Sequence, residues 1–190
     1  MNRKPDRALQ ALRATRQSEL PADLRAKRVM IEARALSDTG RHDVALDVAA
    51  NLDGREVERL RADIQWSARR WRDAAEIIER VYGERWNDLA PLDDGERTDV
   101  LRAAIGYALA EDRLGLDRFR QKYAPKMSES SDGRMFDVVT APLNARIGEF
   151  TEIAKTAASI DTLGTFLRDL RARYPDTSGA VSAVQEAPRT

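Results

Sequence analysis

The sequence contains no cysteine and a single histidine, His42, among its 190 residues. Without cysteine there is no disulfide and no thiolate nucleophile, and with one histidine the usual zinc sites are excluded as well. His42 falls in an expected turn, where a surface or packing role is favoured over catalysis. No two of the ten glycines stand two positions apart, so there is no Gly-x-Gly nucleotide loop. We therefore expect no metal, no other cofactor and no enzyme.

Long apolar runs are missing too. No stretch approaches the ~20 residues that a helix needs to cross a bilayer, and residues 1 to 6 lack the apolar segment of a signal peptide. We expect no membrane insertion of this segment. A cysteine-free chain is compatible with the cytoplasm, which is slightly preferred, and with the periplasm.

The sequence also lacks an excess of charge of either sign. Lysine plus arginine and aspartate plus glutamate number 32 each, so no overall field favours nucleic acid or an anionic surface. The pairs Arg69-Arg70 and Arg118-x-Arg120 are neither extended nor interleaved with exposed aromatics, so no nucleic-acid partner is expected. The acidic run 93–96 leads into a helical pattern rather than a calcium loop, which favours a helix cap.

What the sequence does contain is helical periodicity nearly throughout, with no convincing strand. The clearest stripe is Trp71, Ala74, Ala75, Ile78, Val81 and Tyr82, which Gly83 can end. A second stripe, Val57, Leu60, Ile64 and Ala68, directly precedes it. Because the connection at 68–71 is so short, the two helices are expected to fold back antiparallel and bury their stripes together.

The same design is expected on both sides. Upstream, a helix from Pro21 to about Thr39 ends at Gly40, and a partner helix through residues 45–52 closes near Gly54. Downstream, Asp93 or Asp94 caps a helix through residues 101–109, and its partner through residues 116–123 stops before Pro125. Three helical hairpins in succession are typical of a repeat protein.

Beyond Pro125 the pattern loosens. Residues 127–133 are expected to form a loop, 135–139 a short helix and 150–157 a further helix. A last helix carries Leu163, Phe166, Leu167 and Leu170, is capped by Asp161 or Thr162, ends before Pro175 and suits a terminal cap. The expected architecture is thus an all-α single domain over residues 1–175 with about eight or nine helices, followed by a disordered tail, 176–190.

Small residues recur twelve positions apart, at Ala33 and Ala45, Ala62 and Ala74, and Ala103 and Gly115. They allow two helices to cross closely. With the turns at 40–45 and 69–74, this spacing resembles the tetratricopeptide repeat, although the offsets of 29 and 41 residues depart from the family's 34. The early tryptophan and late proline of that repeat are also missing. The chain is similar, too, to the C-terminal part of long alphaproteobacterial repeat proteins of unknown role.

The resemblance covers about residues 21–125 and implies a right-handed stack of antiparallel helix pairs with a concave groove. First-helix positions off the core would line that groove: Met30, Arg34, Arg59, Asp63, Trp66 and Tyr107. For Trp66 and Tyr107 the alternative is that they pack neighbouring repeats together, and this alternative is favoured. The family's basic clamp for a terminal carboxylate is not recognisable.

The leading functional hypothesis is a scaffold that binds a protein or peptide of unknown identity on the concave face. The alternative is a structural segment that caps a larger repeat protein or self-associates, with a homodimer possible. A third reading is an enzyme or nucleotide-binding domain with an unfamiliar site, for which a deep pocket with close, buried carboxylates would be needed.

Overall fold

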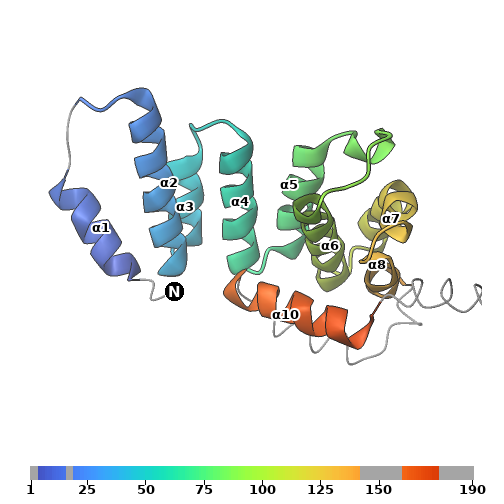
Figure 1. Ribbon diagram of the computed structural model, residues 1–190. Coiled ribbons are helices and arrows are strands. Elements are labelled where there is room, and N and C mark those ends of the chain that lie inside the picture. Colours follow the sequence, from blue (N-terminus) through green and yellow to red (C-terminus); the bar gives the residue numbers. More distant parts are fainter. Residues whose placement is uncertain (1–3, 16–18, 142–159, 176–190) are drawn as a thin grey trace, which may run out of the picture.

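The computed structural model describes residues 4–15, 19–141 and 160–175, and within them every regular element is a helix (Figure 1). The elements in chain order are α1 (Pro5–Ala14), α2 (Ala22–Asp38), α3 (His42–Ala49), α4 (Arg55–Ser67), α5 (Trp71–Tyr82), the 3-10 turn η1 (Arg85–Asn87), α6 (Asp94–Leu109), α7 (Arg113–Ser128), α8 (Gly133–Thr140) and α10 (Ile160–Arg173). The all-α expectation is confirmed for this part of the chain.

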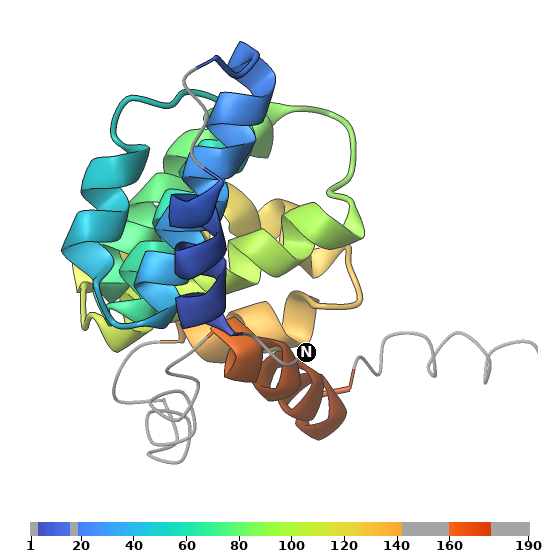
Figure 2. The same ribbon diagram turned by 90° about the vertical axis from the view of Figure 1, so that its left-hand side faces the viewer.

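Helices that follow one another in sequence pack against one another from α1 to α8. Two features depart from this simple order. Helix α6 contacts α5, α7 and also α8, which makes it the central helix of its end of the molecule, and α10 returns to contact α4. In Figures 1 and 2, α10 crosses below α4, α6 and α8 instead of extending the row.

The same three-residue turn joins α2 to α3, α4 to α5 and α6 to α7. Its middle residue is Gly40, Arg69 or Glu111, and each has a positive φ, of 80°, 59° and 55° respectively. In each turn the amide after this residue donates to a carbonyl five positions earlier, as Arg41 does to Leu36. Such a bond with a left-handed residue is a common way to end a helix. Because L side chains disfavour this conformation, the turns at Arg69 and Glu111 are strained, whereas the turn at Gly40 is not.

The small residues twelve positions apart lie inside these three pairs. Ala33, Ala45, Ala62, Ala74 and Ala103 are at most 1% exposed, and Gly115 is buried. A Cβ placed on Gly115 would lie 2.8 Å from the ring of Tyr107. Their size is therefore required by close helix packing, as the spacing predicts.

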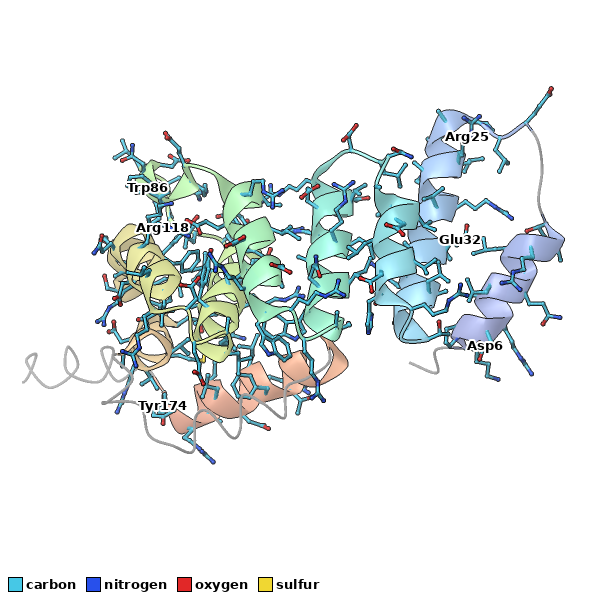
Figure 3. The ribbon with its side chains drawn as sticks, turned by 180° about the vertical axis from the view of Figure 1, so that it is seen from behind. Asp6, Arg25, Glu32, Trp86, Arg118 and Tyr174 are labelled. Carbon is cyan, nitrogen blue, oxygen red and sulfur yellow. The ribbon has the colours of Figure 1, made fainter. Side chains whose placement is uncertain are left out.

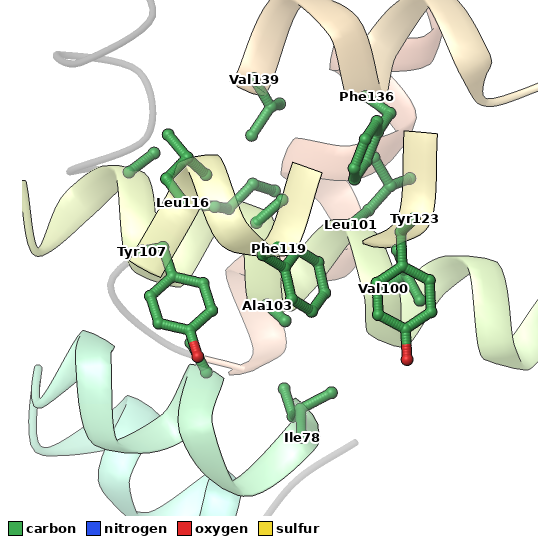
Figure 4. Packing of buried hydrophobic residues seen from close by; sticks show 14 of the residues in the cluster. Ile78, Val100, Leu101, Ala103, Tyr107, Leu116, Phe119, Tyr123, Phe136 and Val139 are labelled. Atoms are coloured by element: carbon green, nitrogen blue, oxygen red, sulfur yellow. The ribbon is translucent and has the colours of Figure 1, made fainter. Parts of the chain in front are cut away.

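Buried apolar residues form two clusters that meet at α4. The N-terminal cluster contains Ala33, Leu36, Ala45, Ala49, Leu60 and Ile64. The C-terminal cluster extends from Ala62 and Trp66 of α4 to Leu170 of α10 and holds most of the large buried side chains (Figure 4). Its centre is α6, in which all nine residues from Val100 to Ala108 are buried. A helix buried on all sides needs neighbours all round it, which α5, α7 and α8 supply.

The connection between α5 and α6 packs onto the C-terminal cluster. Trp86 lies against that cluster, and η1 contacts α7. Arg85 Nε donates to Glu96 Oε1 at 2.9 Å, and Lys126 Nζ of α7 donates to the carbonyl of Ala90 at 2.7 Å. Asp93 caps α6 in a capping box with Glu96, which confirms the expected cap.

Two expected helix ends are wrong. Helix α3 ends at Ala49, before Leu52, and Gly54 with φ of 119° precedes α4 rather than closing α3. Helix α7 does not stop before Pro125 but continues through it to Ser128. Tyr123 and Met127 are buried on either side of this proline, so their packing holds the last turn although proline donates no hydrogen bond.

The C-terminal expectations have a mixed outcome. The short helix around residues 135–139 is present as α8, and α10 ends before Pro175. Helix α10 begins at Ile160, one residue before the expected caps. The helix expected at residues 150–157 and the tail 176–190 lie outside the described residues.

Candidate functional site

Two of the six expected groove residues are core residues, which is a correction. Trp66 and Tyr107 are both 0% exposed. The Trp66 ring meets the edge of Trp71 with centroids 5.0 Å apart, and Tyr107 packs on Phe119 at 5.6 Å. These contacts join α4 to α5 and α6 to α7, so both residues pack helices together instead of facing a groove. Periodicity missed this because a position off one stripe is buried when a further helix covers it.

The hydroxyl of Tyr107 belongs to a polar cluster around Glu79 of α5. Glu79 accepts hydrogen bonds from Tyr107 at 2.6 Å, Lys122 at 2.6 Å and Arg118 at 2.9 Å. Burial raises the pKa of Glu79, but the hydrogen bonds from Lys122, Tyr107 and Arg118 outweigh it and bring the pKa below its ordinary value. Burial and the bond to Glu79 raise the pKa of Tyr107. The cluster therefore ties α5, α6 and α7 together.

Arg59, another expected groove residue, is half exposed and already paired. Its Nη2 lies 3.0 Å from Asp99 Oδ2, which also accepts from the hydroxyl of Tyr82 at 2.6 Å. These bonds connect α4 to α5 and α6. Arg59 thus has a structural role in addition to its exposed surface.

Arg34 and Asp63 are brought together at a pocket between α2 and α4. We call it the α2/α4 pocket; its volume is about 210 Å³, and its lining residues are Arg34, Ser37, Asp38, Leu60, Asp63, Ile64 and Ser67. Leu60 and Ile64, at most 2% exposed, form an apolar floor, whereas Arg34 and Asp38 are exposed at its rim. Met30 precedes Arg34 by one turn and packs, partly buried, against the N-terminal cluster instead of lining this pocket.

Asp63 is held in place by Arg102 of α6. Arg102 Nη1 donates to Asp63 Oδ1 at 2.6 Å, and the guanidinium lies 5.0 Å from the ring centre of Trp66. Arg102 is 9% exposed, and its Nε and Nη2 have no hydrogen-bond partner among the described residues. A buried guanidinium beside the carboxylate and the indole face is stabilised by both. This pair could not be found by local spacing, because 39 residues separate its members.

A second cavity, of about 420 Å³, lies where the last turn of α10 meets the first turns of α6 and α8. Its charged lining residues are Asp94, Arg97, Asp132 and Arg171. Asp132, 4% exposed, accepts from Arg171 Nε at 2.8 Å and from Nη2 at 3.1 Å. Arg97 bonds to Asp94, so each charge here has an opposite partner. No sequence motif suggested this site.

Within the described ranges, no group of three or more His, Asp or Glu side chains has the arrangement of a metal site. In the same part of the chain no helix has the length and apolarity that crossing a bilayer requires. Comparisons of the chain with protein-family models, curated proteins and solved structures found no match. The function is therefore argued from the geometry alone.

Proposed function

We propose that the protein is an interaction module that binds a segment of another protein at the α2/α4 pocket. The observation that carries the proposal is the combination of an apolar floor, Leu60 and Ile64, with a charged rim, Arg34 and Asp38. A buried apolar centre inside a polar rim is the usual anatomy of a protein interface. Asp63, fixed by Arg102, adds an oriented acceptor.

The size and charge of the pocket favour a peptide segment. Small-molecule pockets are typically about 300–1,000 Å³, whereas this one has room for one or two side chains at about 210 Å³. Its rim carries both signs of charge, which suits a segment with an apolar anchor and mixed charges more than a polyanion. The absence of an overall charge excess agrees with this choice.

The architecture that supports this role is a right-handed stack of antiparallel helix pairs, similar to tetratricopeptide repeats. Its proposed units are α2 with α3, α4 with α5 and α6 with α7. Each pair shares the same three-residue turn and the same buried small residues, which favours equivalent units. The α2/α4 pocket then lies between the first helices of two neighbouring units.

The test is selection of short peptides from a display library against the full chain, followed by affinity measurement with an Arg34→Ala, Asp38→Ala variant. We expect selected peptides to bind the variant at least tenfold more weakly, because rim contacts are lost while the core is untouched. A matched control, Arg113→Ala with Asp117→Ala on the exposed side of α7, should bind as the wild type does. Equal affinity for all three proteins would contradict the proposal.

The competing proposal is self-association. At the C-terminal end, α8 and α10 bury large apolar residues, among them Phe136, Phe166 and Leu170. Two exposed apolar residues lie on α2, Leu24 at 47% and Ile31 at 54% exposed, whereas the exposed Val44, Leu89 and Leu114 lie on three other segments. Leu24 and Ile31 are seven positions apart and so share one helix face. Sedimentation velocity over a range of concentrations, with an Ile31→Ser control, distinguishes a dimer through this face from a monomer.

A further inference from the structure

Helix α10 is attached to the rest of the molecule as a bound amphipathic helix would be. Phe166, Leu167 and Leu170 are 4–6% exposed and join the C-terminal cluster, while Arg168 and Asp169 face outward. The spacing i, i+1, i+4 places the three apolar side chains on one stripe. This one-sided contact differs from that of α6, which is buried all round.

The surface beneath α10, which we call the α10 seat, is assembled from other parts of the chain. α10 contacts α4, its apolar residues belong to the cluster built around α6, and Arg171 bonds to Asp132 beside the start of α8. Arg134 of α8 also donates to the carbonyl of Pro175 at 3.3 Å. Figure 3, a view of the molecule from behind, shows Tyr174 at the C-terminal end of α10. The seat is therefore a largely apolar surface across several helices with an acidic residue, Asp132, at one end.

The fit of α10 is incomplete at that end. The cavity of about 420 Å³ is lined by Tyr174 and Pro175 at the end of α10 and by the first turn of α6. In its wall, Arg97 Nε is buried without a hydrogen-bond partner among the described residues and lies 3.5 Å from Asp132 Oδ2. Buried donors are normally paired. A helix with a bulkier end and an acceptor for Arg97 would fit better.

The helix itself is weakened at one position. Gly164 lies inside α10, and a Cβ built there would meet no atom within 4 Å. A glycine within a helix favours the unfolded chain relative to alanine. Since no close approach requires glycine at this position, it lowers the stability of docked α10 without improving its packing.

We propose that α10 is a displaceable occupant of its seat, and that the seat receives an amphipathic helix of a partner protein in its place. The partner helix would carry large apolar residues at i, i+1 and i+4 and a basic residue at i+5, the positions of Phe166, Leu167, Leu170 and Arg171. Recognition of an amphipathic helix in a groove by such anchors is a known mode of peptide binding. This surface differs from the α2/α4 pocket, so the two proposals stand or fall separately.

Displacement is a competition between a tethered and a free helix. A tethered segment acts at an effective concentration in the millimolar range, so a free helix of equal affinity binds weakly until α10 leaves. Changes confined to α10 should therefore alter binding of an added helix although the seat is unchanged. Loosening α10 should strengthen binding of the added helix, and tightening α10 should weaken it.

The experiment measures fluorescence anisotropy of a labelled synthetic peptide with residues 160–175, titrated with the full chain. We expect a Leu167→Ala, Leu170→Ala protein, whose own α10 is loosened, to bind the peptide at least tenfold more tightly than the wild type. The Gly164→Ala protein should bind it about fivefold more weakly, because alanine stabilises docked α10. A peptide with Leu167→Asp and Leu170→Asp is the control and should bind none of the proteins.

Equal peptide affinity for the three proteins, or no binding to the loosened one, would overturn the proposal and make α10 a fixed part of the core. Circular dichroism verifies that the loosened protein keeps its other helices. Gly164→Ala serves as the second variant because its fold is not at risk. The Arg34→Ala, Asp38→Ala variant should bind this peptide as the wild type does, which separates a failure here from a failure of the α2/α4 pocket.

Discussion

The two ends of the molecule build their cores differently. The N-terminal cluster has six buried residues, of which three are alanines and none is aromatic. The C-terminal cluster contains Trp66, Tyr107, Phe119, Tyr123 and Phe136, each at most 1% exposed, and α10 adds a further layer. Aromatic side chains bury about 150–250 Å² each, so the C-terminal end has the larger driving force for folding. The N-terminal end depends instead on the close approach that small residues allow.

The same contrast separates the proposed binding surface from the core. The N-terminal end leaves the α2/α4 pocket and the apolar residues Leu24 and Ile31 exposed. The C-terminal end exposes Leu89 and Leu114, but α10 covers part of its apolar cluster. Helix α4 belongs to both ends, because Leu60 and Ile64 enter one cluster and Ala62 and Trp66 the other. We expect the less buried end to open first.

The largest expected effect comes from Phe119→Ala, which removes an aromatic ring from the centre of the C-terminal cluster. We expect it to lower the free energy of unfolding by about 3–5 kcal/mol, compared with about 2–3 kcal/mol for Leu36→Ala in the thinner cluster. All three tryptophans pack in or against the C-terminal cluster. Their fluorescence therefore reports that end during urea unfolding, while circular dichroism reports all helices.

The two probes also test whether the ends unfold separately. If they do, Leu36→Ala should move the circular dichroism transition to lower urea and leave the fluorescence transition nearly unchanged. Coincident transitions in both variants would show that α4 couples the ends into one cooperative unit. In that case the comparison between the ends holds for the structure but not for stability.

Glu79→Gln should have the next largest effect, about 1–3 kcal/mol at neutral pH, because hydrogen bonds to a buried charge are lost. The folded pKa of Glu79 is below its ordinary value of 4.5. Its contribution is therefore present above about pH 4.5 and disappears as the pH falls through the folded pKa. Thermal unfolding should show wild type and variant far apart at pH 7 and converging in acid. A constant difference between them would contradict this assignment.

Substitution by glycine at the strained turns should raise the free energy of unfolding by about 1 kcal/mol. Glu111→Gly and Arg69→Gly should each stabilise the protein by about this amount, since glycine adopts a positive φ without a Cβ clash. The N-terminal turn already has glycine, so Gly40→Ala should lower the free energy of unfolding by a similar amount. Urea unfolding measures all three changes. A loss on introducing glycine at either position would mean that its side chain has a stabilising contact.

Much of the local structure could be predicted from the sequence. Periodicity placed the helices between residues 22 and 109, and Gly40, Gly83 and Asp93 marked their ends. Of the expected groove residues, Arg34 and Asp63 line the α2/α4 pocket, while Trp66 and Tyr107 are core residues. Periodicity predicts the face of a helix that one neighbouring helix covers. Helices α4 and α6 each pack against several helices, so they bury residues outside that face. The alternative for both aromatics was that they pack neighbouring repeats together, and their complete burial agrees with a packing role.

The smallest expected effect is on the exposed face of α2. Ile31→Ser should change the free energy of unfolding by no more than about 0.5 kcal/mol, because Ile31 is 54% exposed. Thermal unfolding at two protein concentrations checks this. A larger loss that grows with concentration would indicate that this face is covered by a second copy of the chain.

The sequence by itself determined the helical class, the positions of most helices and the three pairs with their small residues. These depend on local propensity and on spacing along one helix, which a sequence displays directly. Only the tertiary structure decided that Glu79 meets Tyr107, Lys122 and Arg118, that Asp63 meets Arg102, and that α10 returns to α4. Such contacts join residues far apart in the chain, and they depend on how helices stack in space. The physical reason is that burial is a property of the neighbours of a side chain, not of its place in the sequence.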